Sequence, residues 1–561
     1  MRRLAFLAAL SLLAAACGDG GGGAVKNKLT VVSGKDVDYI DCGQAYARAS
    51  FQICAATQRA LYGHRPGDPT TMVPDLARSA PRVSDGGRTV TVQLRTGIRF
   101  SPPVNRAVTS RDVKYAIERG FFSTVGNAYS GAYFGDLVGA RPGVEPGTRI
   151  AGIATPSPDT IVFHLTKPSG GLLADGALAL PLTAPVPEEY ARRYDDDKSG
   201  LSSYGDHQVA TGPYMVRTYT PGREIVLVRN PNWKRATDFK PARLDEIVVR
   251  EGTSDPALGT RRILRSRSQV NGSFSAPRSV LLKLPRRERR QVVMAPGNNV
   301  RWVSLNTTIA PFDDVNVRRA VLAGFDRAAL REARGGVFAA QMPTHFLPPG
   351  TNGFEQAGGI KGPGLKFLNA SGRPDAKLSA QYFRRAGYRS GRYTGKQPLL
   401  MVGEMVGTGT RIAEAAKESF ERMGFNVKLK LALTIPMYSK YCNIPAAQVA
   451  ICTNVGWPRD FEDGQTMLDP TFNGAHIPSA NNSNWSQLDV PSVNRAMARA
   501  ERAITPAARG AAWAQVDRLV TAQAPAIPWA WDTVPLVESA NVRGVVDRAN
   551  SNWALAWTSL K

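Results

Sequence analysis

Histidine and cysteine are scarce in this chain of 561 residues, which contains only five of each. The histidines show no H-E-x-x-H spacing, and no two cysteines form a C-x-x-C pair. The chain also lacks a G-x-S-x-G nucleophile elbow and the lysine of a phosphate-binding loop. These absences argue against a zinc site, a nucleophilic active site and a nucleotide site. We therefore expect no enzyme, no metal and no cofactor.

Acidic residues are also few, because 46 Asp and Glu face 71 Lys and Arg and leave a formal net charge of +25. The densest basic stretch spans residues 261–290. It contains Arg261, Arg262, Arg265, Arg267, Arg278, Lys283, Arg286, Arg287, Arg289 and Arg290. Such a stretch indicates either a solvated face or a surface for an anionic membrane or wall polymer. No stacking platform or helix-turn-helix pattern accompanies it, so we expect no nucleic-acid partner.

Long apolar runs are absent too, since none approaches the 20 or so residues that cross a bilayer. Arg2 and Arg3 precede a mostly apolar run at residues 4–16, which is typical of a signal peptide over residues 1–16. The alanines before Cys17 resemble a bacterial lipobox, which implies lipidation of Cys17; the alternative is an ordinary signal peptide with a chance cysteine. Residues 17–28 would then be a glycine-rich tether. We expect a chain anchored by lipid to the extracytoplasmic face of the cell membrane.

The four remaining cysteines form two local groups in the sequence. Outside the cytosol an even set predicts disulfides, and four cysteines allow three connectivities. We favour the two local pairings, Cys42 with Cys54 and Cys442 with Cys452.

Periodic patterns predict a mixed α/β protein. Alternating apolar residues predict strands at residues 88–95, 160–166 and 224–230. Thr109 and Asp112 form a possible capping box for a following helix. Residues 412–423 carry one apolar helical face, and alternation from Phe425 to Leu431 then predicts a strand. A further helix opens with Thr505 and Pro506 at its N-cap and first position.

Several segments occur in the order typical of one family. "MVPDLARSAPRVSDGGRTVTVQLRTGIRFS" at residues 72–101 is the longest, and the others lie at residues 109–119, 210–216, 227–235, 303–327 and 524–531. Together they resemble the extracytoplasmic solute-binding proteins of peptide and nickel ABC importers, the dipeptide- and oligopeptide-binding proteins of solute-binding family 5. The resemblance covers most of the mature chain.

This resemblance implies a two-lobed α/β fold of the type II periplasmic-binding-protein kind, with two hinge crossovers. Lobe one would comprise residues 29–297 and 525–561, with an extra α+β subdomain near residues 61–187. Lobe two would comprise residues 300–524. The resemblance also implies a monomer that closes around its ligand and works with an ABC permease and ATPase.

The stretch "NVGWPRDFEDGQTM" at residues 454–467 carries the candidate site. In peptide-binding relatives a W-x-x-D-aromatic segment lines the cleft, and its aspartate takes the ligand's ammonium group. The pattern falls here on Trp457, Asp460 and Phe461. Core packing is the alternative for Trp457. Glu462 and Asp463 are expected to be acids of the loop or of a helix entry.

Two functions remain open at this point. The first is the membrane-anchored binding component of an ABC importer for a peptide-like solute. The second is an envelope lipoprotein without a transport role, either a peptide sensor or an adhesin for anionic wall polymer. The segment "RSRSQVNGSF" departs from the family by being basic, so Arg265 or Arg267 either edges a cleft for an anionic ligand or belongs to a solvated face.

Overall fold

The computed structural model describes residues 27–34, 37–196 and 199–561. The predicted signal peptide, Cys17 and most of the predicted tether lie outside these residues. Among the residues described, no helix combines the length and the apolar character that a membrane crossing requires.

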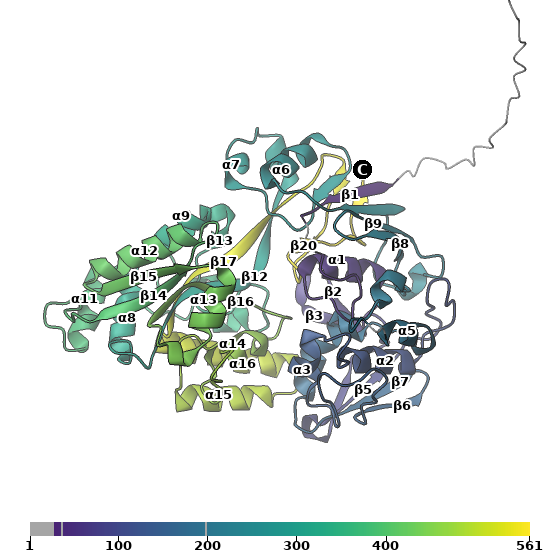
Figure 1. The fold of residues 1–561 in the computed structure, drawn as a ribbon, viewed down its shortest axis with the longest axis horizontal. Coiled ribbons are helices and arrows are strands. Elements are labelled where there is room, and N and C mark those ends of the chain that lie inside the picture. The colour runs from purple at the N-terminus through teal and green to yellow at the C-terminus, as the bar shows by residue number, and fades with distance from the viewer. Residues whose placement is uncertain (1–26, 35–36, 197–198) are drawn as a thin grey trace, which may run out of the picture.

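Two large sheets organise the molecule (Figure 1). The five-stranded sheet has the order β11-β1-β10-β9-β8, built from Gln269–Asn271, Lys28–Val32, Glu246–Arg250, Glu224–Arg229 and Tyr214–Thr220. The six-stranded sheet has the order β13-β17-β12-β16-β14-β15. Its strands are Ala340–Gln341, Ala526–Val537, Val292–Leu305, Ile451–Pro458, Pro398–Glu404 and Asn426–Ala432.

The two long strands β12 and β17 pair with each other and belong to both halves of the molecule. Near one end Ala295 and Leu536 pack into the core of the five-stranded sheet. Near the other, Val303 pairs with Ile527 inside the core of the six-stranded sheet. The register shifts between Pro296 and Val300, at the point where the strands pass from one core to the other. These strands are therefore the two crossovers between the lobes.

The predicted α-to-β unit is present in the six-stranded sheet. Helix α12 (Gly409–Arg422) joins the parallel neighbours β14 and β15. Its residues Ile412, Ala416 and Phe420 are all fully buried, because they share one helical face. Helices α8 (Val315–Gly324), α9 (Arg327–Arg334) and α11 (Ala376–Arg385) pack around the same core.

A smaller antiparallel sheet lies within the first 170 residues and has the order β4-β5-β7-β6. Its strands are Arg82–Ser84, Thr89–Gln93, Thr160–His164 and Ile153–Ser157. Helix α2 (Ser110–Gly120) covers it, and the predicted capping box of Thr109 and Asp112 is formed. Hairpin β2–β3 (Tyr62–Arg65, Asp68–Pro74) and helices α3 (Ala128–Phe134), α4 (Gly170–Asp175) and α5 (Glu188–Asp195) belong to the same region. The predicted domain boundaries stay a prediction.

Several local predictions are confirmed. Thr505 accepts a hydrogen bond from the backbone of Ala508 and so caps α16 (Pro506–Gln523), with Pro506 at its first position. Helices α14 (Gln465–Phe472) and α15 (Pro491–Glu501) precede it. Disulfides join Cys42 to Cys54 on α1 (Arg48–Thr57), and Cys442 to Cys452 on β16, as the local pairings predicted.

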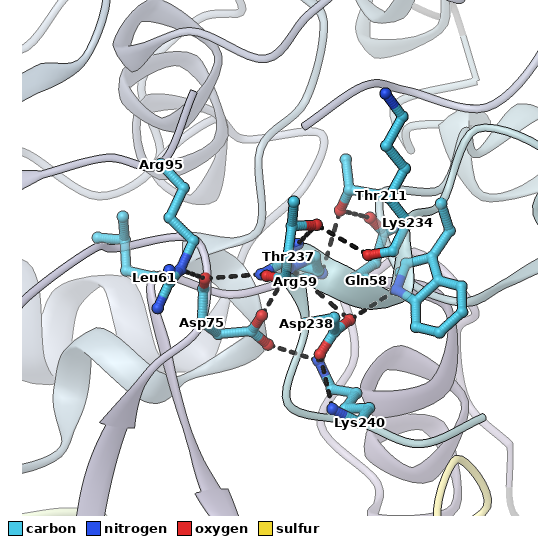
Figure 2. A network of polar contacts seen from close by, with 12 residues as sticks. Gln58, Arg59, Leu61, Asp75, Arg95, Thr211, Lys234, Thr237, Asp238 and Lys240 are labelled. Carbon is cyan, nitrogen blue, oxygen red and sulfur yellow. Dashed lines mark hydrogen bonds and ion pairs between the residues drawn. The ribbon is translucent and has the colours of Figure 1, made fainter. Parts of the chain in front are cut away.

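A buried polar network ties the smaller sheet's region to the rest of its lobe (Figure 2). The Arg59 Nε atom lies 2.6 Å from Asp75 Oδ1 and 3.8 Å from Asp238 Oδ2. Its Nη2 atom donates to the carbonyl oxygens of Asp75 and Thr237. Burial alone would raise the pKa of Asp238, but Lys240 and Arg59 outweigh burial and hold this pKa below its usual value. The buried charges are thus paired and hydrogen-bonded.

A second buried cluster lies where α4 meets α16. Arg509 on α16 forms an ion pair with Asp463 and lies 3.9 Å from Asp175 Oδ2 on α4. Asn352 Nδ2 donates to the same Asp175 oxygen over 3.1 Å. Burial and the neighbouring Asp463 raise the pKa of Asp175 to about 8. Because one guanidinium faces two carboxylates, this contact holds a proton at neutral pH.

We expect Arg59→Ala to lower the free energy of unfolding by about 3–5 kcal/mol, because it leaves two buried carboxylates with one fewer cation. Urea denaturation followed by circular dichroism measures this change. Arg78 is the matched control, since it is exposed and, within the described part of the chain, its side chain donates to Gln93 alone. Arg78→Ala should change stability by less than about 0.5 kcal/mol. Equal losses in both variants would contradict the role given to the network.

Asp175→Asn should flatten the pH dependence of stability. The native chain keeps the Asp175 proton up to about pH 8, whereas the unfolded chain releases it near pH 4. The free energy of unfolding therefore falls by up to about 1.4 kcal/mol per pH unit in this window, and the asparagine removes that slope. Thermal denaturation between pH 5 and 8 tests this. The exposed Asp196→Asn should keep the slope, and an unchanged slope in Asp175→Asn would disprove the assignment.

Candidate functional site

The segment that follows β16, residues 459–463, reaches from the six-stranded sheet's lobe to the other lobe. Phe461 is 4% exposed and joins the hydrophobic core of the region that contains α2 and α4. Its ring meets Tyr133 of α3 edge-on, with ring centroids 4.8 Å apart. Gly176 passes so close that a Cβ atom there would lie 2.2 Å from the Phe461 ring. Phe461 therefore seats the segment in a fixed position between the lobes.

Asp460 lies beside this anchor and faces a row of tyrosines. Its Oδ2 atom accepts a hydrogen bond from the Tyr133 hydroxyl group. Tyr133 stacks on Tyr129 with centroids 6.0 Å apart, and Tyr129 stacks on Tyr46 at 5.5 Å. Burial raises the pKa of Asp460 to about 6, although the bond from Tyr133 opposes this shift. Asp460 is thus mostly ionised at pH 7.

Asp460 has no cationic partner among the residues that the structure describes, because no Lys, Arg or His nitrogen lies within 4.0 Å of its carboxylate. Its neighbours differ in this respect. Glu462 lies 3.5 Å from Arg459 and 3.7 Å from His64. Asp463 pairs with Arg509 and accepts a bond from the Gln465 backbone at the start of α14. Asp463 is therefore a helix-entry acid, as expected, and Asp460 is left available for a cation.

A cavity of about 160 Å³ lies next to Asp460. One face of α1 forms part of its wall, and Asp460, Phe461 and Glu462 close it from the other lobe. The wall is largely apolar and aromatic, with a few polar groups; it includes Phe51, Gln52, Gln58, His64, Leu180, Phe239, Lys240, Asn550, Trp553 and Trp557. A concave, mainly apolar space with convergent polar groups is the usual form of a small-molecule site.

Trp457 lies outside the wall of this cavity. Its indole Nε1 atom donates to the carbonyl oxygen of Thr466 over 2.9 Å, and its ring lies 6.3 Å from that of Trp485. The side chain is half-buried at the edge of the core beneath β16. The structure thus brings together Asp460 and Phe461, and places Trp457 beside them on the core side.

A charged cluster that the sequence did not reveal lies where β12 and β17 cross. Asp532 Oδ2 lies 2.9 Å from Arg301 Nε and 2.8 Å from Arg334 Nη2, and it also accepts a bond from Asn299. Burial alone would raise the pKa of Asp532, but the two arginines keep it below its usual value. Strand register brings Asn299 and Arg301 to Asp532, helix α9 contributes Arg334, and no local sequence signal marks these residues.

Arg265 and Arg267 are both exposed and lie just before β11, at the edge of the five-stranded sheet. The cavity wall contains neither residue. Their position agrees with the solvated-face interpretation.

Comparisons with known proteins show which family the chain belongs to. The family model for "Bacterial extracellular solute-binding proteins, family 5 Middle" matches residues 71–479. The glutathione-binding protein GsiB of Salmonella typhimurium is 24% identical over 325 residues, which are 57% of this chain and 56% of that protein. Di/tripeptide-binding protein 2 of Pseudomonas aeruginosa is 27% identical over 279 residues, 48% of this chain and 49% of that protein. The matched part therefore spans about half the length of these curated relatives.

Solved structures extend the likeness to nearly the whole chain. Clavulanic acid biosynthesis oligopeptide binding protein 2 has a TM-score of 0.80 and 27% identity, with 95% of each chain covered. The periplasmic binding protein DppA from Helicobacter pylori, in complex with the peptide STSA, has a TM-score of 0.66 and 20% identity, covering 95% of this chain and 98% of that one. The predicted two-lobed α/β fold is confirmed. The chain belongs to family 5 of the bacterial extracellular solute-binding proteins.

Proposed function

We propose that this protein is the membrane-anchored, extracytoplasmic binding component of an ABC importer, and that it captures a peptide-like solute between its lobes for delivery to a permease and ATPase. The ionised and unpaired Asp460, which lies at a cavity wall between the lobes, carries this proposal. The names of the relatives support it, since they are glutathione-binding, di/tripeptide-binding and oligopeptide-binding proteins.

In this proposal the ligand's ammonium group donates to Asp460. A charge-assisted hydrogen bond in a partly buried site contributes about 1.5–3 kcal/mol, more than an exposed ion pair. Asp460 comes from one lobe and its partner Tyr133 from the other. An ammonium group at this carboxylate therefore stabilises the closed arrangement, because burying Asp460 without a cation is unfavourable.

The two aromatic residues of the motif have different roles in the proposal. Phe461 forms part of the cavity wall and holds Asp460 in place through its contact with Tyr133. Trp457 is half-buried and lies outside the cavity wall, so its exposed part offers a face only to an aliphatic or cationic group of a ligand that extends beyond the cavity.

A screen for ligands tests the proposal against its alternatives. Native mass spectrometry of the purified protein would detect co-purified ligand, and thermal shift with di- to octapeptides would then define the length class. Stabilisation by peptides supports the receptor. No bound species and no shift with any peptide would contradict it and favour a non-peptide solute or an adhesin. A receptor should bind one buried ligand per protein molecule. An adhesin should instead bind without single-site stoichiometry, and salt should weaken its binding.

Asp460→Asn should weaken the binding of peptides with a free ammonium group more than tenfold, because the amide carries no charge. In the unmodified chain the affinity should rise from pH 5 to pH 7 as Asp460 ionises near pH 6. The variant should lack this rise. Isothermal titration calorimetry with a peptide found in the screen measures both effects.

The matched control is Asp489→Asn, since Asp489 is exposed and bonds to Asn494. It should leave affinity and its pH dependence intact. N-acetylated peptides should bind the unmodified chain and the Asp460 variant with similar affinity. An unchanged affinity of Asp460→Asn for the free peptide would remove Asp460 from the site.

Cys17→Ala should release the protein from the membrane fraction, because the chain would lose its predicted lipid anchor. Fractionation of cells at low and high salt, with mass analysis of the N-terminal peptide, measures this. Retention of the variant in the membrane fraction at both salt concentrations would show that the anchor is not at Cys17.

A further inference from the structure

The basic stretch 261–290 forms one exposed surface on the lobe that contains β1. Helix α6 (Pro256–Arg265) begins this surface. Leu258, Arg261, Arg262 and Arg265 recur at helical spacing and are all exposed, while Ile263 and Leu264 on the opposite side are buried. Helix α7 (Arg278–Leu281) and the segment after it continue the surface.

This surface carries a large uncompensated positive charge. All ten Lys and Arg residues of the stretch are exposed. Among the described residues only two of them form ion pairs, Arg278 with Glu332 at 3.0 Å and Arg287 with Glu288 at 4.0 Å. Of the other eight, Arg289 donates from its Nε atom to the carbonyl oxygen of Leu284 over 3.1 Å. None of the eight charges is neutralised by a described carboxylate, so they repel one another unless an anionic partner is present.

Exposed apolar side chains lie among these cations. Leu258 is 64% exposed, Leu282 is 57% exposed, and Val337, next to the glycine that Arg278 approaches, is 63% exposed. A hydrated anionic polymer gains little from contact with such side chains. A layer of lipid headgroups accommodates both the cations and the apolar side chains. The cations bind the phosphate groups, and the apolar side chains enter the boundary with the acyl chains.

The surface also lies where the chain leaves the lobe toward Cys17. The backbone N–H of Thr30 on β1 donates to the carbonyl of Ser268, directly after Arg267. Strand β1 begins at Lys28, 11 positions after Cys17, so 10 residues lie between them. Such a length reaches at most about 36–40 Å when fully extended. Figure 1 shows α6 and α7 at the same end of the molecule as β1, and α15 at the opposite end.

We propose that this surface, defined by α6, α7 and residues 282–290, docks on anionic phospholipid headgroups and so fixes the orientation of the anchored receptor. The part played by the tether rests on the lipid anchor of the proposed function. The positive charge and the exposed apolar side chains of the surface are independent of that anchor. Each arginine near an anionic bilayer adds to the attraction, and salt screens it.

Vesicle co-sedimentation tests the proposal without the lipid anchor. Every protein is the full chain with Cys17→Ala, so that the leader and tether contribute equally to all. Vesicles of phosphatidylglycerol with phosphatidylcholine are compared with vesicles of phosphatidylcholine alone. The α6 variant carries Arg261→Gln, Arg262→Gln and Arg265→Gln. The control variant carries Arg495→Gln, Arg499→Gln and Arg502→Gln, which remove the same charge from exposed positions in and next to α15.

The α6 variant should bind the anionic vesicles at least about tenfold more weakly, and the control less than about twofold. A second variant, Arg286→Gln with Arg290→Gln, should also weaken binding and replaces the first if α6 unfolds. Three outcomes would each overturn the proposal. The α6 and control variants could lose binding equally, or the protein could bind both kinds of vesicle equally. The protein could also be retained by purified wall polymer without binding vesicles. The α6 variant should bind peptides with unchanged affinity. If none of the proteins bound peptides, the receptor function would be refuted, but the docking on lipid would not.

Discussion

The pairing of β12 with β17 is the constraint on which the arrangement of the lobes depends. Each strand contributes to both cores, so the lobes are joined by a two-stranded ribbon. At the crossing the backbones approach so closely that a Cβ atom at Gly297 would lie 2.4 Å from the carbonyl oxygen of Asp532. Glycine is therefore required there. The two strands of the ribbon pair within each lobe, and their register shifts between Pro296 and Val300. A bend at this shift would leave the paired residues on either side in place.

Contacts between the lobes away from the ribbon consist of side chains that can separate. Phe461 fills a space against Tyr133 and Gly176, and Asn352 donates to Asp175. Opening would expose Phe461 and return Asp175 to water, where its pKa relaxes toward the ordinary value. The contacts between the lobes thus gain from apolar burial and are opposed by the buried carboxylates. In the proposed function a cationic ligand group would reduce the electrostatic opposition and so couple binding to closure.

The features that the sequence predicted well depend on residues close together in the chain. The cap at Thr109, the entry of α16 at Thr505, the two local disulfides and the α12–β15 unit each involve fewer than about 25 residues. The family resemblance supplied the fold and pointed to Asp460. Its partner Tyr133 lies 327 residues away, and Arg301 lies 231 residues from Asp532. Such pairs depend on strand register and lobe docking, which periodicity does not encode.

The three acids after Trp457 also explain why a basic chain concentrates carboxylates in one short segment. Glu462 is held by Arg459 and His64, and Asp463 by Arg509, so both anchor the segment with charges from the chain itself. Asp460 precedes them in the chain, and among the described residues its one side-chain partner is the neutral hydroxyl group of Tyr133. Since Arg459, His64 and Arg509 are already engaged by the other two acids, no arginine of the described part of the chain lies within ion-pair distance of Asp460. The paired acids therefore fix the position of Asp460, which is where the proposed function places the ammonium group of the ligand.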